Sequence, residues 1–88
     1  MSEITDRNLI GAKLKELNGT KIIVTVEEAS GAITSGNVIG YTTGGHKNLA
    51  TGEIVKPAVS ISYTEKGTLY SPTINIEDII KVTIRQLP

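Results

Sequence analysis

Residues 30–41, SGAITSGNVIGY, decide which fold the sequence predicts, because glycines interrupt a segment that otherwise has the composition of a β-strand. Gly31 follows Ser30 in a turn-forming dipeptide, whereas Gly36 lies in the middle of the β-branched run. Glycine weakens a strand interior, so its presence there indicates a bend, a bulge or the close approach of another backbone. We interpret Gly31 as a hairpin turn, Gly36 as the point where a strand curls, and Gly40 as a second bend. The alternative is that a ligand lies against one of these glycines.

The residues before this stretch predict a short helix and a first strand. Residues 5–18 carry leucines and isoleucines at close to helical spacing, and Asn18-Gly19 tolerates the left-handed conformation that ends a helix. Residues 20–29 then alternate apolar and polar side chains, which is typical of a strand with one buried face. The candidate N-caps of the helix are Ser2, Thr5 and Asp6.

The residues after the stretch predict further short strands joined by turns. A polar, glycine-rich loop occupies 43–53, residues 65–68 have the composition of a hairpin turn, and 76–79 that of a single helical turn. Pro57 and Pro72 each interrupt a strand pattern, because proline cannot donate to a ladder. The strands are expected at 32–43, 58–65, 69–75 and 80–86, and Ile54 and Val55 could start the second of these before Pro57 interrupts it. The last strand has Ile80, Val82 and Ile84 on one face.

The composition bounds the classes of function. A chain of 88 residues is one domain with a small core, so oligomerisation would be a natural way to bury more surface. Nine basic and nine acidic residues balance, which excludes nucleic-acid binding by bulk electrostatics. The absence of cysteine excludes disulfides and thiolate metal sites. We see no signal peptide and no membrane span, and we expect a soluble, cytoplasmic protein with no membrane partner.

These patterns predict a single domain, residues 1–88, of mainly β structure. A helix at about 5–18 would pack over one end of a small, strongly bent antiparallel barrel of about five strands at about 20–86. The alternative is an open sheet with the helix across one face. The expected core residues are Leu9, Leu14, Leu17, Ile22, Val24, Val26, Val38, Val59, Ile61, Ile79, Val82 and Ile84.

Two segments carry a resemblance to a known family. The positions that carry it in the first half of the chain are Gly19, Val24, Val26, Gly31, Gly36, Val38 and Tyr41. Their order and spacing resemble the first half of an Sm-like domain, one of the SH3-like barrels, over about residues 5–42. Residues 73–84, TINIEDIIKVTI, are similar to the closing segment of many SH3-like barrels, in which a one-turn helix precedes the last strand.

The resemblance implies a barrel fold more directly than it implies RNA binding. Sm-like proteins usually place an aspartate directly after the aromatic position and an asparagine a few residues later, to contact an RNA base. Here Thr42 and Thr43 follow Tyr41, and two glycines come next. The family's Arg-Gly pair between the last two strands is also absent, so its RNA-binding residues do not carry over.

The glycine-rich loop is the candidate binding site. The backbone amides of Gly44 and Gly45, together with Lys47, could hold an anion, but we favour a plain hairpin loop. His46 is the single histidine, which excludes a multi-histidine metal site, and it has no obvious catalytic partner. We predict no catalytic residue, no metal ligand and no cofactor. The candidate binding residues are Tyr41, Gly44, Gly45, His46, Lys47 and Asn48.

The other charged and aromatic residues favour structural roles. Glu27-Glu28 would project to opposite faces of a strand, and Glu77-Asp78 suits the start of a helical turn, so neither is a catalytic pair. Tyr63 is in phase with the apolar residues of its strand and is expected in the core. The lysines interpreted as a solvated face are Lys13, Lys15 and Lys21, and the tyrosines expected to be exposed are Tyr41 and Tyr70.

We therefore expect a non-enzymatic small β-barrel module for protein interaction or self-assembly, as a homo-oligomer or with a protein partner. Edge strands that pair across subunits would be its mode of assembly. The alternative function is that of an Sm-like protein that binds RNA or another nucleic acid through Tyr41, the loop at 44–48 and the nearby lysines. An enzyme ranks last.

Overall fold

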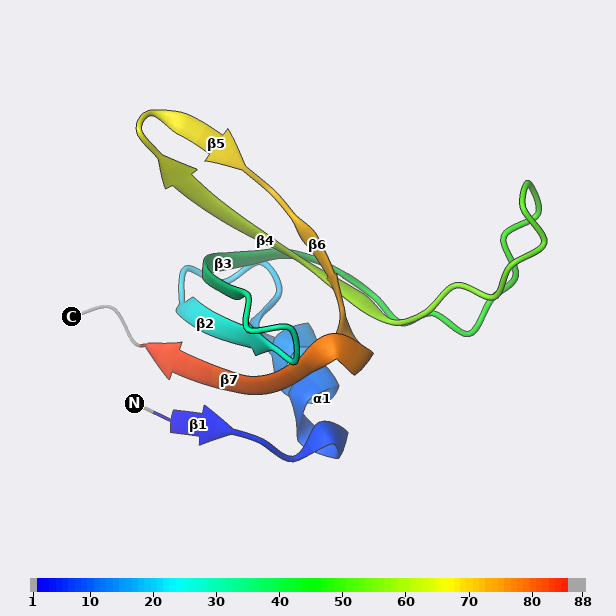
Figure 1. Cartoon of the computed structure of the whole chain (residues 1–88), viewed down its shortest axis with the longest axis horizontal. Helices are drawn as coiled ribbons and strands as arrows, with labels where there is room; N and C mark the ends of the chain where they lie inside the picture. Colours follow the sequence, from blue (N-terminus) through cyan, green and yellow to red (C-terminus); the bar gives the residue numbers. More distant parts are fainter. Residues whose placement is uncertain (1, 86–88) are drawn as a thin grey trace.

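A computed structural model of the chain describes residues 2–85 and contains one helix and one bent antiparallel sheet (Figure 1). The sheet has seven strands in the order β1-β7-β2-β3-β4-β5, and β6 also pairs with β4. In chain order the elements are β1 (Ser2–Ile4), α1 (Arg7–Leu17), β2 (Ile23–Glu28), β3 (Ile33–Thr42), β4 (Ala58–Glu65), β5 (Thr68–Tyr70), β6 (Thr73–Asn75), the 3-10 turn η1 (Ile76–Asp78) and β7 (Ile79–Arg85).

The sheet is open, so the expected closed barrel of about five strands is wrong and the alternative of an open sheet is confirmed. Two of the additional strands have simple origins. β1 pairs with β7 through residues that were expected to precede or cap the helix. The strand expected at 69–75 is divided into β5 and β6 because Pro72 interrupts it, and the Pro72 carbonyl accepts a bond from the Ile61 amide of β4.

Gly36 lies next to the point where β3 passes from pairing with β2 to pairing with β4, and it makes the close backbone approach that the sequence predicts. The first half of β3 pairs with β2 and the second half with β4, and Asn37 pairs with both neighbours. A Cβ atom on Gly36 would clash with the Ser62 carbonyl oxygen and lie 2.9 Å from its carbon. Only a residue without a side chain lets the two backbones approach this closely. This close approach is made by the protein's own β4, which confirms the structural interpretation of Gly36.

Gly31 and Gly40 have different structural roles. Gly31 has a φ of 95° and donates its amide to the Glu28 carbonyl, which makes it the predicted turn glycine. A Cβ on Gly40 would meet Ser60 Cβ at an ordinary distance of 3.6 Å. The irregularity near Gly40 is a bulge, because the β3–β4 register shifts between Val38 and Gly40.

The helix begins and ends close to the expected residues. Asp6 is the N-cap, and its side chain accepts a bond of 2.9 Å from the Asn8 amide, whereas the alternative cap Ser2 lies in β1. Asn18 is the C-cap, and Gly19 follows with a φ of 81°.

Ile10, Leu14 and Leu17 bury one stripe of α1 against the inner side of the sheet. The expectation that Leu9 belongs to the core is wrong, because Ile10 takes that place and leaves Leu9 56 % exposed.

In the other strands, buried and exposed side chains alternate as the sequence predicts. In β7 this alternation is interrupted, because the register of β7 with β2 shifts between Glu27 and Glu28. The bulge puts Ile79 in phase with Val82 and leaves Ile80 46 % exposed, so the expected buried face of Ile80, Val82 and Ile84 is wrong at its first residue. Ile22 is half-buried at the edge of the core. The buried apolar side chains of the core are Ile10, Leu14, Leu17, Val24, Val26, Val38, Val59, Ile61, Ile74, Ile79, Val82 and Ile84.

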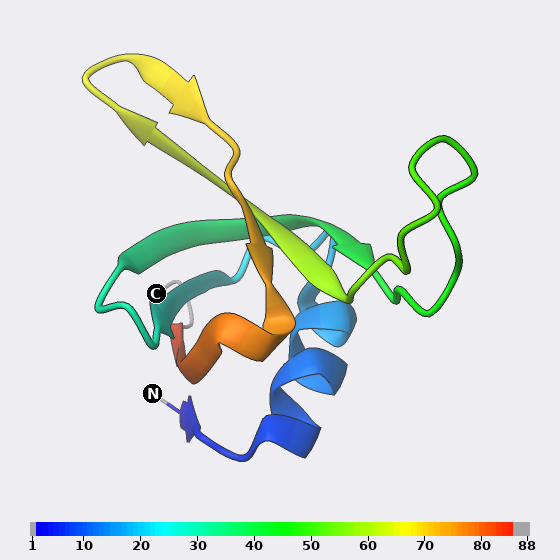
Figure 2. The same cartoon turned by 45° about the vertical axis from the view of Figure 1, so that its right-hand side comes forward.

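Two segments project from this body on different sides (Figures 1 and 2). One is the end of the β4–β5 hairpin, which turns at Lys66-Gly67, where both residues have positive φ as a two-residue hairpin requires. The other is the segment at residues 43–57, here called the 43–57 loop, which joins β3 to β4. Together they give the molecule a longest extent of 44 Å against a shortest of 25 Å.

Candidate functional site

The candidate binding residues divide into two groups in space. Gly44–Asn48 form one limb of the projecting 43–57 loop, which runs beside the limb at 53–55. Tyr41 belongs to β3, opposite Val59, and packs half-buried against the core. The expectation that Tyr41 is exposed is therefore wrong. A Cβ on Gly11 would lie 3.0 Å from the Tyr41 hydroxyl, so the helix glycine makes room for the tyrosine.

The 43–57 loop is an ordered, two-limbed structure with its own hydrogen bonds. Lys47 and Ile54 form an antiparallel bridge. On one side of this bridge the Val55 amide donates to the His46 carbonyl, and on the other side the Asn48 amide donates to the Glu53 carbonyl. At the tip, Asn48 closes the turn twice. Its side chain accepts a bond of 2.9 Å from the Ala50 amide, and its carbonyl accepts one of 2.7 Å from the Gly52 amide. These bonds fix a defined turn at the end of the loop.

The root of the loop depends on Gly44. This residue has a φ of 70°, and a Cβ there would lie 2.6 to 2.7 Å from Pro57 N, Lys56 C and Val55 O. The two limbs therefore cross at a distance that admits no side chain. Gly45 also has a positive φ, of 77°, but a Cβ there would meet no atom within 4 Å.

One of the backbone donors considered for an anion is already used within the loop. The Gly45 amide donates to the Val55 carbonyl at 2.8 Å. The His46 side chain is exposed, and within residues 2–85 it has no hydrogen-bond or ion-pair partner. Among these same residues, no group of three or more histidine and acidic side chains is placed to hold a metal ion.

The loop instead presents apolar side chains to solvent. Leu49, at its tip, is 96 % exposed, and Ile54 is 64 % exposed. The β4–β5 hairpin does the same with Leu69, which is 66 % exposed. On the opposite face of that hairpin Tyr63 and Tyr70 stack with ring centroids 5.3 Å apart. The expectation that Tyr63 belongs to the core is wrong, because Tyr63 is half-buried outside the core cluster. Tyr70 is exposed as expected.

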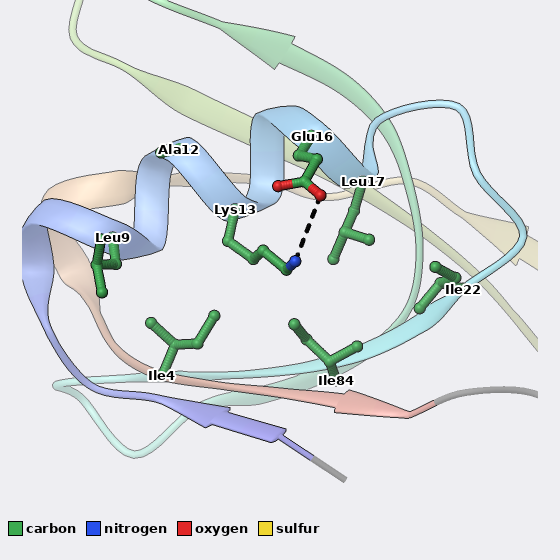
Figure 3. A pocket seen from close by; sticks show the side chains of 8 residues that line it. All are labelled: Ile4, Leu9, Ala12, Lys13, Glu16, Leu17, Ile22 and Ile84. Atoms are coloured by element: carbon green, nitrogen blue, oxygen red, sulfur yellow. Dashed lines mark hydrogen bonds and ion pairs between the residues drawn. The ribbon is translucent and has the colours of Figure 1, made fainter.

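An apolar groove lies between α1 and the strands at the edge of the sheet (Figure 3). Its volume is about 500 Å³. Lys13 and Glu16, three positions apart on α1, form an ion pair of 3.4 Å and are the charged groups of its lining. We call it the α1 groove. It is lined by Ile4, Leu9, Ala12, Lys13, Glu16, Leu17, Ile22 and Ile84.

Sequence reasoning missed the α1 groove. Leu9 and Ile10 are adjacent and both fit the period of an apolar stripe, so the sequence does not show which of the two is left to border a groove. Leu9, Ala12 and Glu16 form a second stripe beside the buried one, and this stripe borders the groove. Lys13, interpreted as part of a solvated basic face, is one of the residues that line the groove and is paired with Glu16.

An ion pair joins the root of the loop to the body. Lys56 Nζ donates to Glu77 Oε1 at 2.9 Å, which links the end of the 43–57 loop to η1. The hydrogen bond with Glu77, followed by the attraction of the Glu77 and Asp78 charges, raises the pKa of Lys56 above its usual value of 10.5.

Comparisons of the chain with models of protein families, with curated proteins and with solved structures found no significant match. No helix within residues 2–85 is both long and apolar enough to cross a membrane.

Proposed function

We propose that this chain is a non-enzymatic module that assembles with copies of itself or with another protein. The observation that carries the proposal is the placement of exposed apolar side chains on its two projections. Leu49 and Ile54 lie on the 43–57 loop, and Leu69 and Tyr70 lie on the β4–β5 hairpin. Apolar side chains grouped on segments that extend from a compact body favour contact with another macromolecule.

The β4–β5 hairpin also offers a strand edge. β5 pairs with β4 on one side, at Tyr70, Leu69 and Thr68. Because hydrogen-bonded and non-hydrogen-bonded pairs alternate along an antiparallel ladder, the Leu69 N–H and C=O point away from β4. A free edge with an exposed leucine suits the addition of a strand from a second molecule.

We also propose that the fold is a relative of the Sm-like and SH3-like barrels that has an open sheet. Three features support this relationship. A helix precedes the first long strand, β3 bends at Gly36, and the single turn η1 leads directly into the last strand. The observed strand neighbours β7-β2-β3-β4 fit such a barrel, to which β1 has been added at the edge of β7.

Nucleic-acid binding is less well supported by the same geometry. Tyr41, the aromatic residue of the Sm-like resemblance, is half-buried against the core with its hydroxyl near Gly11, so little of its ring is free to stack on a base. Lys13 is paired with Glu16, and Lys56 with Glu77, so part of the positive charge is already neutralised.

The proposal is tested by the solution mass of the full chain, measured by light scattering from about 10 μM to about 1 mM, with and without a short mixed-sequence RNA. We expect a mass above that of the monomer that rises with concentration and is unchanged by RNA. Apolar contacts weaken little with salt, so the mass should also persist when the salt concentration is raised. A monomer that gains mass only with RNA, and loses it in salt, would replace the proposal with the nucleic-acid alternative. A monomer at every concentration, indifferent to RNA, would overturn self-assembly.

A further inference from the structure

Asn18 is the one asparagine of the sequence that precedes a glycine. A side chain on the following residue hinders attack of the backbone nitrogen on the asparagine amide, and glycine offers no such hindrance. Both Asn18 and Gly19 are exposed, so water reaches the pair. The chemistry of deamidation is therefore concentrated at this dipeptide. The other asparagines each precede a leucine, a valine or an isoleucine, and they are Asn8, Asn37, Asn48 and Asn75.

Deamidation at this pair needs no reactant other than water. The Gly19 backbone nitrogen loses its proton and attacks Asn18 Cγ, so that a Cγ–N bond forms and the Cγ–Nδ2 bond breaks. The amide nitrogen takes up a proton and leaves as ammonia, and a succinimide ring remains. Water then adds to one of the two ring carbonyls and opens the ring to aspartate or to isoaspartate.

The fold holds the pair in a geometry that opposes ring closure. Asn18 is the C-cap of α1, with a φ of -58° and a ψ of 126°, and this ψ turns the Gly19 nitrogen away from the Asn18 side chain. The Gly19 amide donates to the Val38 carbonyl of β3 at 3.0 Å. Ring closure requires rotation about the Asn18 Cα–C bond, and this rotation breaks the bond to Val38. The reaction therefore depends on opening of the junction between α1 and β2.

β3 holds this junction, residues 18–22, at a second point. The Asn37 side-chain amide donates to the Ile22 carbonyl at 3.3 Å, one residue before β2 begins. Leu17 and Ile22 stand on either side of the junction and line the α1 groove (Figure 3). An aspartate at position 18 would place a negative charge at the negative end of the helix dipole, and an isoaspartate would lengthen the backbone. Either product changes the connection between these two lining residues.

We propose that Asn18 is a deamidation site and that the contacts of its junction with β3 restrain the reaction in the folded chain. The modification goes beyond the assembly function proposed above and does not depend on it. Opening of the junction alone is sufficient for the reaction, because local openings cost less free energy than global unfolding. Deamidation gives one negative charge to a chain that is formally neutral.

Incubation of the full chain at mildly alkaline pH, followed by peptide mapping with mass spectrometry, tests the site. We expect aspartate and isoaspartate to accumulate at Asn18 and not at the other asparagines. The same chain unfolded in guanidinium chloride should react at Asn18 at least about tenfold faster, because the restraint is absent. If the folded chain reacts at Asn18 no more than at the other asparagines, or as fast as the unfolded chain, the inference is overturned.

Two variants separate opening of the junction from global unfolding. Asn37→Ser removes the bond to the Ile22 carbonyl and should speed the reaction at Asn18 by about three- to tenfold, as loss of one hydrogen bond predicts. Val59→Ala leaves a cavity in the core at β4 and should lower the melting temperature without changing this rate. Circular dichroism verifies that both variants are folded during the incubation. Equal acceleration by the two variants, or none by Asn37→Ser, would overturn the restraint by β3.

Discussion

The body and the 43–57 loop each contain a glycine against which a second backbone segment lies closely. In the body this close approach lies within the core, whereas in the loop it lies at the root of a projecting segment. In the body, Gly36 lets β3 bend against Ser62, and the alternating side chains around it close on a common core. At the root of the loop, Gly44 lets two limbs cross, and the residues beyond it are polar or exposed. A tight backbone approach therefore fixes the path of the chain, whereas the pattern of side chains decides whether that path leads into a core or away from it.

The comparison predicts different energetic consequences for the two regions. The body gains its stability from burial, which is shared by residues of the helix and of most strands. The 43–57 loop contributes no residue to the buried core, so it can change with little loss of global stability. A region that the fold carries but does not need for its stability is available for recognition.

The largest effect is expected from Gly36→Ala. The added Cβ would overlap the Ser62 carbonyl, and β3 cannot move away without breaking its pairing with both neighbours. We expect a loss of roughly 3 kcal/mol or more in the free energy of unfolding, which is a large part of the stability of a small domain. Urea denaturation followed by far-UV circular dichroism measures it. Gly40→Ala is the matched control, since its Cβ would meet Ser60 at an ordinary distance, and an equal loss in both variants would contradict the argument.

The next largest effect is expected from Leu14→Ala. Leu14 is fully buried, and removing a leucine side chain from a core costs about 2–5 kcal/mol in the free energy of unfolding. Leu9→Ala, on the same helix, should cost well under half as much, because Leu9 is 56 % exposed at the side of the groove. Thermal denaturation of the two variants compares them directly. Similar losses would mean that Leu9 belongs to the core after all.

The contrast between Leu9 and Leu14 also shows how far the sequence alone could lead. Helical spacing predicted α1 correctly, and alternation predicted most of the core strands, because burial on one face leaves a period in the sequence. Leu9 and Ile10 fit that period equally well, and only tertiary packing chooses between them. The same holds for Ile79 and Ile80, where a bulge set by the register with β2 decides which side chain is buried.

The candidate site was less predictable than the fold for a related reason. The glycine-rich loop was recognised from its composition, and the positions of Gly44–Asn48 within it follow directly. The Gly45 amide donates to the Val55 carbonyl, and the Tyr41 hydroxyl lies near Gly11. Both contacts join segments that are distant in the sequence, so the sequence did not predict them. Whether the sheet closes into a barrel is equally hard to predict from the sequence. Closure depends on which strand edges meet, and the residue pattern of each strand does not show this.

A smaller global effect, concentrated in the loop, is expected from Gly44→Ala. Positive φ disfavours alanine by about 1–2 kcal/mol, and the crossing with Val55–Pro57 adds a clash, so the limbs should separate. We expect fast amide exchange at Gly45, Asn48 and Val55, while the amides of β2 and β7 stay protected. NMR hydrogen exchange resolves the two regions. Gly45→Ala has the same strained φ without the clash and should loosen the loop less. If the core amides lost protection as well, the loop and the body would be a single cooperative unit.

The smallest effect is expected from the ion pair that joins the two regions. The folded pKa of Lys56 is raised by its hydrogen bond to Glu77, so the pair stabilises the native state below the unfolded pKa of 10.5, and its contribution is lost as the pH rises through the folded pKa. Lys56→Gln should therefore lower the melting temperature slightly at pH 8, and the difference from the natural chain should disappear above the folded pKa. Both side chains are more than half exposed, so added salt should also reduce the difference at pH 8. Lys21→Gln removes an exposed lysine that has no ion pair among residues 2–85, so it is the control for the loss of a lysine side chain alone. A difference for Lys56→Gln that stayed constant across the alkaline range would mean that its alkyl chain, rather than its charge, holds the root of the loop to the body.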